Sequence, residues 1–468
     1  MRAFEFILVI LVAARLLTGL KWKDRWVDWL VILTTGVLFI HLGLEGFRWQ
    51  MVPIYMTIGF MTIFAVSHIV TQKSPKKLSF SKFLISIVFL LVATAIPILI
   101  PIPKTKEPSG PYGIGTKTVM LVDTSREELY SQVSPSPRKL MVQIWYPTDP
   151  EKTGEKSPWI ENADIMAPAI AEFLNLPNHS LNYLRYVFSH AYKDTPLSER
   201  TDRYPILLFS HGWSGFRSQN TFQVEELVSH GFVVAAPDHI YGAVASVFPD
   251  GEVALLNPDA LPDKGSLPEQ ERLNAVRQLG DQWAGDLSFL LDTLLDPVLI
   301  DELSMFSGRL DPEKVGIFGH STGGGAAIEF CVRDQRCEAV LGMDPYMEPV
   351  SLEVINEGID KPLMAMFSEA WNNREDDNQT NFDKLKGNSS DTVFEFTIIG
   401  TTHYDFSDLP GLSPLAHAAG LKGSIPGKQV VRLISDYSLA FFTEELLDNK
   451  NPLVDDLISK YPEVLWSR

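Results

Sequence analysis

Cysteine is scarce in this sequence: Cys331 and Cys337 are the two cysteines in a chain of 468 residues. So few cysteines exclude a scaffold built from disulfides and a cysteine-rich metal module. Basic residues are also in deficit, because 40 Lys and Arg face 58 Asp and Glu, for a formal net charge of −18. Nucleic acids are bound through basic patches that meet their phosphates, so we expect no nucleic-acid partner.

The deficit of basic charge is confined to one part of the chain. Residues 1–106 hold 12 basic and 4 acidic side chains, whereas residues 107–468 hold 28 basic and 54 acidic ones. The first part is also much richer in Leu, Ile, Val and Phe. Such a shift is typical of a boundary between a membrane region and a soluble domain. We therefore expect a membrane region over 1–106 and a soluble domain over 107–468.

Long apolar runs fill the first part, at about 4–20, 27–44, 52–70 and 83–102. Each run is close to the roughly 17–25 residues that a helix needs to cross a bilayer. A cleaved signal peptide could explain the first run alone, but not the other three. The sequence therefore predicts four transmembrane helices with the lipid bilayer as a partner.

Lysine and arginine gather in the loops after the first and third runs, at Lys21, Lys23, Arg25, Lys73, Lys76, Lys77 and Lys82. The loop between the second and third runs has no such excess. Basic loops stay in the cytoplasm, so an even number of spans puts both the N-terminus and the soluble domain on the extracytoplasmic side. The membrane is expected to be the plasma membrane. His41 and His68 lie near span ends and are expected at the membrane interface.

The second part alternates short apolar segments with longer amphipathic ones. Strands are predicted at 117–122, 139–146, 205–210, 232–236, 314–319, 338–343, 362–367 and 393–399. Helices are predicted at about 220–230, 268–297, 321–333 and 428–447. This alternation indicates an α/β fold with a mostly parallel sheet. The polar segments 246–267 and 372–390 are expected to be loops.

One motif in the second part predicts chemistry. The segment KVGIFGHSTGGGAAIEF, at 314–330, reads as a strand, then Gly319-x-Ser321-x-Gly323, then a helix. A nucleophile elbow needs this strand–turn–helix arrangement, which raises the serine hydroxyl above the sheet. Gly319 and Gly323 remove side chains where a tight turn brings backbone against backbone. We therefore expect an α/β-hydrolase with Ser321 as its nucleophile.

A serine nucleophile needs a base and an acid, which in this fold follow it in the order acid, then histidine. His403 follows the strand at 393–399 in the loop GTTHYDF, whereas His417 is expected on a helix, so His403 is the predicted base. Asp344 and Glu369 each follow a predicted strand after the nucleophile. The residues alone leave the acid open between them.

The developing oxyanion of an ester hydrolase needs two N–H donors. The backbone N–H of Thr322, directly after the nucleophile, is one candidate. The early loop in ILLFSHGWSGFR, at 206–217, supplies the other, and the N–H of Trp213 is the candidate there. The neighbouring His211 is expected to hold that loop by a hydrogen bond, and a structural role is likewise expected of His239 and His320.

Five segments together resemble a known family: GPYGIGT, FSHGWSGFR, LVSHGFVVAAPDH, GHSTGG and DQRCEAVLGMDPYMEP, all within 108–447. They are similar to the plasma-type (group II) platelet-activating factor acetylhydrolases and their bacterial relatives. The resemblance implies an α/β-hydrolase that removes short or oxidised sn-2 acyl chains from phospholipids without a cofactor or metal. It implies Asp344 as the acid, which leaves Glu369 as a pocket or surface residue.

The resemblance also implies Ser321 as nucleophile, His403 as base, and Trp213 and Thr322 as oxyanion donors. Trp213 and Thr322 differ from the side chains typical of better-known members, which puts the acyl preference in doubt. The resemblance does not cover residues 1–106. Two alternatives stay open: a membrane-anchored carboxylesterase or lipase of broader specificity, and a catalytically silent membrane sensor.

Cys331 and Cys337 flank a short turn between the nucleophile helix and the next strand. On the extracytoplasmic side they could form one local disulfide. Two buried thiols are an equally good reading of the residues.

Overall fold

The computed structural model describes residues 1–22, 24–131, 135–151, 153–297, 300–372, 377–447 and 453–467. The chain divides into two compact units. The N-terminal unit comprises Met1–Pro103 with Leu412–Leu415, and the C-terminal unit comprises Lys104–Gly411 with Ala416–Arg468. Lys23, which contributes to the expected cytoplasmic charge, lies outside the described residues.

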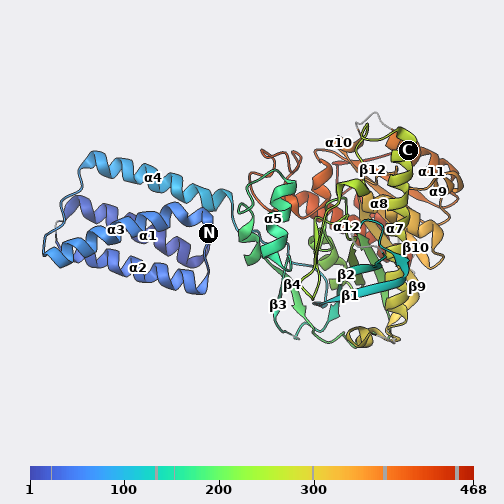
Figure 1. The fold of residues 1–468 in the computed structure, drawn as a ribbon, viewed down its shortest axis with the longest axis horizontal. Helices are drawn as coiled ribbons and strands as arrows, with labels where there is room; N and C mark the ends of the chain where they lie inside the picture. The colour runs from blue at the N-terminus through green and yellow to red at the C-terminus, as the bar shows by residue number, and fades with distance from the viewer. Residues whose placement is uncertain are drawn as a thin grey trace. The chain divides into compact units, whose positions relative to one another are not determined.

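The N-terminal unit is built from four long apolar helices: α1 (Ala3–Lys21), α2 (Trp26–Leu44), α3 (Val52–Thr71, preceded by the 3-10 turn η1, Trp49–Met51) and α4 (Phe80–Leu99) (Figure 1). All four are long and apolar enough to cross a membrane, as the sequence predicts. They share a small core that includes Leu8, Val12 and Ile58, while many large apolar side chains, such as Phe39 and Phe64, point outward. Outward apolar side chains are what a bilayer requires of a spanning helix.

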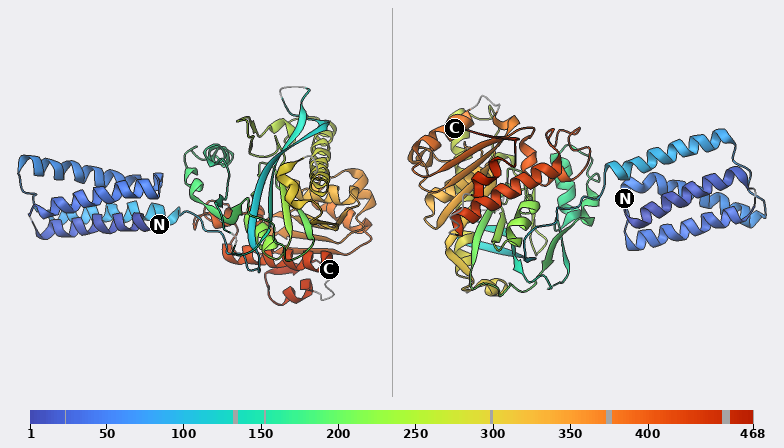
Figure 2. Two further views of the ribbon diagram at one scale, coloured as in Figure 1. Left: turned by 90° about the horizontal axis from the view of Figure 1, so that it is seen from below. Right: turned by 180° about the vertical axis from the view of Figure 1, so that it is seen from behind.

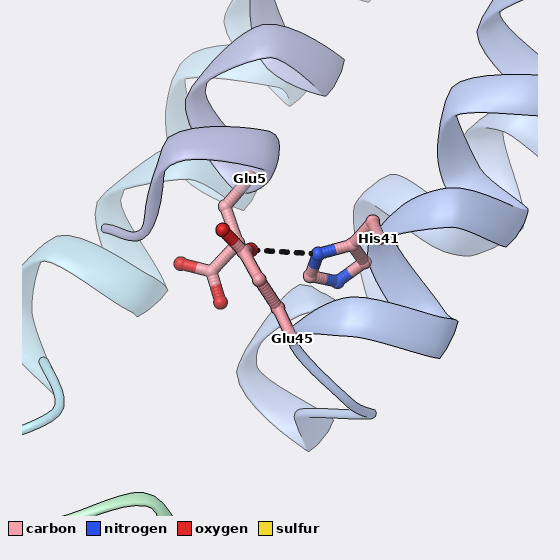
Figure 3. Close-up of side chains that lie close together, drawn as sticks. All are labelled: Glu5, His41 and Glu45. Atoms are coloured by element: carbon pink, nitrogen blue, oxygen red, sulfur yellow. Dashed lines mark hydrogen bonds and ion pairs between the residues drawn. The ribbon is translucent and has the colours of Figure 1, made fainter.

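Charged side chains gather where α1 begins and α2 ends (Figure 3). His41, in the last turn of α2, is fully buried, with Nδ1 2.9 Å from Glu45 and Nε2 2.7 Å from the hydroxyl of Tyr55. Glu5, His41 and Glu45 lie close enough to share a metal ion. However, Arg48 pairs with Glu5 at 3.0 Å and both His41 nitrogens are engaged, so we assign this group the structural role of joining helix ends.

The C-terminal unit is organised around one sheet of eleven strands in the order β13-β12-β11-β10-β9-β5-β6-β2-β1-β4-β3 (Figure 1). The strands are β1 (Gly113–Glu127), β2 (Pro137–Thr148), β3 (Lys156–Pro158), β4 (Phe188–Lys193), β5 (Tyr204–Ser210), β6 (Val233–Asp238), β9 (Leu310–His320), β10 (Cys337–Met343), β11 (Leu363–Ser368), β12 (Val393–Ile398) and β13 (Val464–Trp466). The central strands β6, β5, β9, β10, β11 and β12 run parallel. β1, β2 and β6 pair antiparallel, as do β12 and β13. β5 and β6 are buried along their whole length, which explains their continuous apolar sequences.

Helices cover both faces of the sheet, and Figure 2 shows α7 and α12 on opposite sides of it. One face packs against α7 (Glu269–Leu295), α8 (Thr322–Arg333), α9 (Leu352–Glu357) and α11 (Asp377–Asn388). The other face packs against α6 (Thr221–Ser229), α12 (Gly427–Leu446) and α13 (Leu453–Ile458). The remaining helices are α5 (Ala163–Phe173) and the short α10 (Glu369–Asn372). This is the α/β architecture that the alternating sequence pattern predicts.

Three local expectations were wrong. The segment 372–390 contains α11, whose buried Phe382 and Leu385 are spaced for one helix face despite a polar sequence. The segment 246–267 belongs partly to a hairpin, β7 (Ala245–Val247) with β8 (Val253–Leu255). His417 lies in an exposed turn rather than on a helix.

Candidate active site

Ser321 occupies the sharp turn between β9 and α8. Its backbone has φ 55° and ψ −121°, a strained conformation for a residue that is not glycine. A Cβ on Gly319 would lie 2.2 Å from the carbonyl oxygen of Gly323, and a Cβ on Gly323 would lie 2.2 Å from that of Ser210. Both positions therefore demand glycine, and the turn delivers the Ser321 side chain to a pocket at the carboxyl ends of the parallel strands.

Asp344 and His403 meet beside this turn. Nδ1 of His403 lies 2.9 Å from Oδ2 of Asp344, which is completely buried just after β10. The backbone N–H and the hydroxyl of Ser368 also donate to Asp344, at 2.6 and 2.7 Å. Since a carboxylate accepts only, the Nδ1 of His403 carries the proton and its Nε2 is left with a lone pair. That is the tautomer a base needs to take a proton from serine.

Glu369, the other candidate acid, points elsewhere. It begins α10, directly after β11, and its carboxylate accepts the backbone N–H of Gly400 at 2.8 Å. Glu369 does not line the pocket that contains Ser321 and His403. The geometry therefore favours Asp344 over Glu369 as the partner of His403.

Trp213 and Thr322, whose backbone N–H groups are the candidate oxyanion donors, both line the same pocket. Within the part of the chain that the structure describes, neither donates to another protein group. Thr322 is the first residue of α8, where helical N–H groups have no partner within the helix and carry partial positive charge. Two such donors in a pocket that also contains Ser321 are the kind of group that can stabilise an oxyanion.

The peptide between Gly212 and Trp213 is held in a fixed orientation. The Gly212 carbonyl accepts hydrogen bonds from Nδ1 of His211 at 2.7 Å and from the N–H of Gly215 at 2.8 Å. In a trans peptide the N–H points opposite to the carbonyl, so tying down this carbonyl also fixes the direction of the Trp213 N–H. His211 thus has the loop-holding role expected from the sequence.

A second serine–histidine–aspartate set lies beside the candidate oxyanion loop, residues 211–217. Nε2 of His239 is 3.0 Å from the hydroxyl of Ser210, and its Nδ1 is 2.9 Å from Asp286. All three are fully buried, so no substrate reaches them. Burial opposes ionisation of Asp286, but the charge of Arg138 and the hydrogen bond from His239 outweigh it and lower the pKa of that carboxyl. This set therefore supports the loop rather than performing chemistry.

The pocket has a volume of about 410 Å³ and apolar walls formed by Trp159, Ile170, Phe173, Leu174, Phe216 and Leu409. Half-buried Asp408 holds one wall in place, because it accepts hydrogen bonds from the indole of Trp159 at 2.8 Å and from the N–H of Thr221 at 2.9 Å. Burial raises the pKa of Asp408 to about 7. A cavity of this size and polarity fits a small apolar group next to Ser321.

Several residues around the site carry no signal in the sequence. The indole of Trp371 stacks on the imidazole of His403, with ring centroids 4.4 Å apart and planes 13° apart. Ser368 orients Asp344, and Gln219 contacts His320 next to the nucleophile. None of them belongs to a motif, so tertiary contacts alone reveal them.

Cys331 and Cys337 are joined by a disulfide, with their Cα atoms 5.1 Å apart. The bond links the last turn of α8 to the start of β10. It lies outside the residues that line the pocket, so its place in the fold is structural.

Comparison with known proteins gives a consistent result. A profile of the family described as "Platelet-activating factor acetylhydrolase, isoform II" matches residues 101–258 and 270–463. A platelet-activating factor acetylhydrolase of Cavia porcellus is 28% identical over 361 residues, which are 73% of this chain and 78% of that protein. A probable 1-alkyl-2-acetylglycerophosphocholine esterase of Arthroderma benhamiae is 26% identical over 417 residues, 81% of this chain and 98% of the relative.

Among solved structures, a ferulic acid esterase from Streptomyces cinnamoneus superposes with a TM-score of 0.64. The match covers 79% of this chain and all of the esterase, at 24% identity. At that identity the likeness supports the fold alone.

Proposed function

The chain belongs to the platelet-activating factor acetylhydrolase isoform II family and is a carboxylic ester hydrolase, and we propose that it works through Ser321, His403 and Asp344. The observation that carries this proposal is the hydrogen bond from His403 to buried Asp344 at the edge of the pocket that holds Ser321. This bond leaves the opposite nitrogen of His403 able to accept a proton.

In the proposed reaction, Nε2 of His403 takes the hydroxyl proton of Ser321 as its oxygen attacks the ester carbonyl carbon. The N–H groups of Trp213 and Thr322 bind the oxyanion, and Asp344 stabilises the imidazolium. The carbon–oxygen bond to the alcohol then breaks, and His403 returns the proton to the leaving alcohol. Water then attacks the acyl-enzyme while His403 takes a proton from it. His403 returns that proton to the oxygen of Ser321, and the carboxylic acid is released.

The proposed substrates are phospholipids with a short or oxidised sn-2 acyl chain. Family membership supports this class, and a pocket of about 410 Å³ with apolar walls suits a short acyl group. Membership in an esterase family makes the sensor alternative less attractive. A broader carboxylesterase or lipase remains the second candidate, because the pocket walls alone do not distinguish a phospholipid from another ester.

We further propose that residues 1–106 form a four-helix membrane anchor and that the hydrolase domain, residues 107–468, faces the extracytoplasmic side of the plasma membrane. The four apolar helices and the basic loops between them support this placement. A disulfide in the C-terminal unit is compatible with an oxidising compartment.

Hydrolysis by the purified full-length protein across a series of sn-2 acyl lengths tests the proposal. We expect acetyl and short oxidised chains to be cleaved fastest, and the Ser321→Ala variant to lose hydrolysis and labelling by a fluorophosphonate. A preference for long-chain triglycerides would favour the lipase. Activity retained by Ser321→Ala would overturn the assignment of the nucleophile.

A further inference from the structure

The side-chain amide of Gln219 connects the loop at Gly212 to His320, the last residue of β9. Its Oε1 accepts the backbone N–H of Gly212, in the oxyanion loop, at 3.3 Å. Its Nε2 donates to Nδ1 of His320, the residue before the nucleophile, at 3.0 Å. Nε2 of His320 in turn lies 3.0 Å from the backbone carbonyl of His403. The chain of hydrogen bonds thus runs from the oxyanion loop past the nucleophile to the base.

The orientation of the Gln219 amide is fixed by its neighbours. The Gly212 N–H can only donate, so it faces the amide oxygen, and Oδ1 of Asn220 accepts from the amide nitrogen at 3.1 Å. Nδ1 of His320 therefore accepts a hydrogen bond from Gln219 and carries no proton of its own. Because the His403 carbonyl accepts only, the single proton of His320 resides on Nε2.

The charge state of His320 matters because its ring lies beside the ring of the base. The two ring centroids are 4.4 Å apart. His403 becomes an imidazolium in the transition state, and a second positive charge at this distance would oppose that step. The titratable groups that act on His320 are His403 and Asp344. Burial, reinforced by His403, lowers the pKa of His320 to about 3, consistent with a neutral ring.

We propose that Gln219 and His320 are positioning residues: Gln219 selects the neutral Nε2–H form of His320, and His320 holds the backbone of His403 in place for proton transfer. This inference rests on the proposed function, because it assigns His403 as the base. Neither side chain touches the reacting atoms in the proposed reaction. Their effect is transmitted through the loops at Gly212 and His403.

Four variants of the full-length protein in detergent test the proposal, with a soluble acetyl ester as substrate and fluorophosphonate titration to count active sites. Gln219→Met and His320→Leu remove the hydrogen bonds at similar volume. Each should lower kcat about tenfold per active site with little change in KM, the effect of misplacing a base. His320→Gln keeps an N–H for the His403 carbonyl and should recover most of the activity lost in His320→Leu.

Gln219→Glu changes the charge as well. A carboxylate opposite Nδ1 accepts only, so His320 can satisfy both neighbours only as an imidazolium. The positive ring beside His403 should lower kcat and move the acidic limb of the kcat/KM profile to lower pH. An acidic limb that stays in place or moves to higher pH overturns the proposed control of His320 by Gln219.

Gln143→Met is the matched control, because Gln143 is also a buried glutamine but bonds to Thr116 outside the pocket. It should lose stability without a change in kcat per active site. Wild-type kcat in Gln219→Met and His320→Leu, with Ser321→Ala inactive, overturns the positioning roles alone. Activity in Ser321→Ala instead overturns the proposed function on which they rest.

Discussion

Trp371 stacks face to face on His403, although Trp371 belongs to α10, after β11, and His403 to the 3-10 turn η5 (His403–Phe406), after β12. The electron-rich face of an indole attracts a cation, so this contact favours the imidazolium that His403 forms in the proposed reaction. It also limits rotation of the imidazole about its side-chain bonds. The stacking and the hydrogen bond to Asp344 together fix the ring in two directions.

Replacing Trp371 should therefore weaken the base. We expect Trp371→Leu to lower kcat roughly five- to thirtyfold, equivalent to about 1–2 kcal/mol of lost cation–π and packing contact. The acidic limb of the kcat/KM profile should move to lower pH, because the protonated ring loses its partner. Trp371→Phe, which keeps an aromatic face, should fall between Trp371→Leu and the wild type. A pH profile in Trp371→Leu identical to that of the wild type would contradict this role.

Asp344 and Glu369 can be separated by paired substitutions. Asp344→Asn should lower kcat by roughly 10³–10⁴-fold, because an amide no longer stabilises the imidazolium and favours the wrong tautomer of His403. Glu369→Gln should stay within about threefold of wild type, since its carboxylate bonds to the backbone of Gly400 and not to the base. Steady-state kinetics with the same acetyl ester measure both. The assignment fails if the two variants behave alike or in the reverse order.

The disulfide between Cys331 and Cys337 closes a short loop, with a sequence separation of 6. A loop of this length reduces the entropy of the unfolded chain enough to add ~2 kcal/mol of stability. The Cys331→Ala/Cys337→Ala variant should therefore unfold at lower temperature while keeping the kcat of the wild type. Counting free thiols in protein purified with a thiol-blocking reagent checks the bond directly. Two free thiols before reduction would contradict it.

Stability should fall in acid because buried histidines are held neutral. Burial lowers the pKa of His211, His239 and His320, the last to about 3. Below the ordinary pKa of about 6.5, the unfolded chain binds protons that the folded chain does not. Each histidine then removes about 1.4 kcal/mol of unfolding free energy per pH unit as pH falls from 6.5 toward its lowered pKa.

His320→Gln isolates one of these contributions. Its unfolding free energy should depend less steeply on pH between about 6 and 4, by about 1.4 kcal/mol per unit relative to wild type. Comparing the two proteins removes the opposing effect of groups such as Asp408, whose raised pKa acts in the other direction and is common to both. Denaturant titrations followed by tryptophan fluorescence supply the values. Parallel pH dependences would show that His320 is not held neutral.

The sequence by itself determined the architecture and the chemistry. Apolar runs of fixed length predict four spanning helices, and alternation of apolar strands with amphipathic helices predicts the α/β sheet. Both patterns follow from local periodicity, so a single sequence displays them. The elbow around Ser321 is equally local, because its two glycines and its strand–turn–helix context lie within a few residues. Helices with little apolar content, such as α11, were not predicted, because a polar segment gives a weak periodic signal and tertiary contacts stabilise the helix.

Only the tertiary structure shows which candidate acid bonds to His403 and how the imidazole is held. Asp344 and Glu369 both follow strands after Ser321. In the fold, Asp344 bonds to His403, whereas Glu369 bonds to the backbone of Gly400. Trp371, in α10, and Gln219, in the turn before α6, belong to no motif, so nothing in their local sequence indicates their contacts. Spacing along the chain determines which elements form. Contacts between side chains far apart in sequence exist only once those elements have packed, and they set the position and the hydrogen-bond partners of His403.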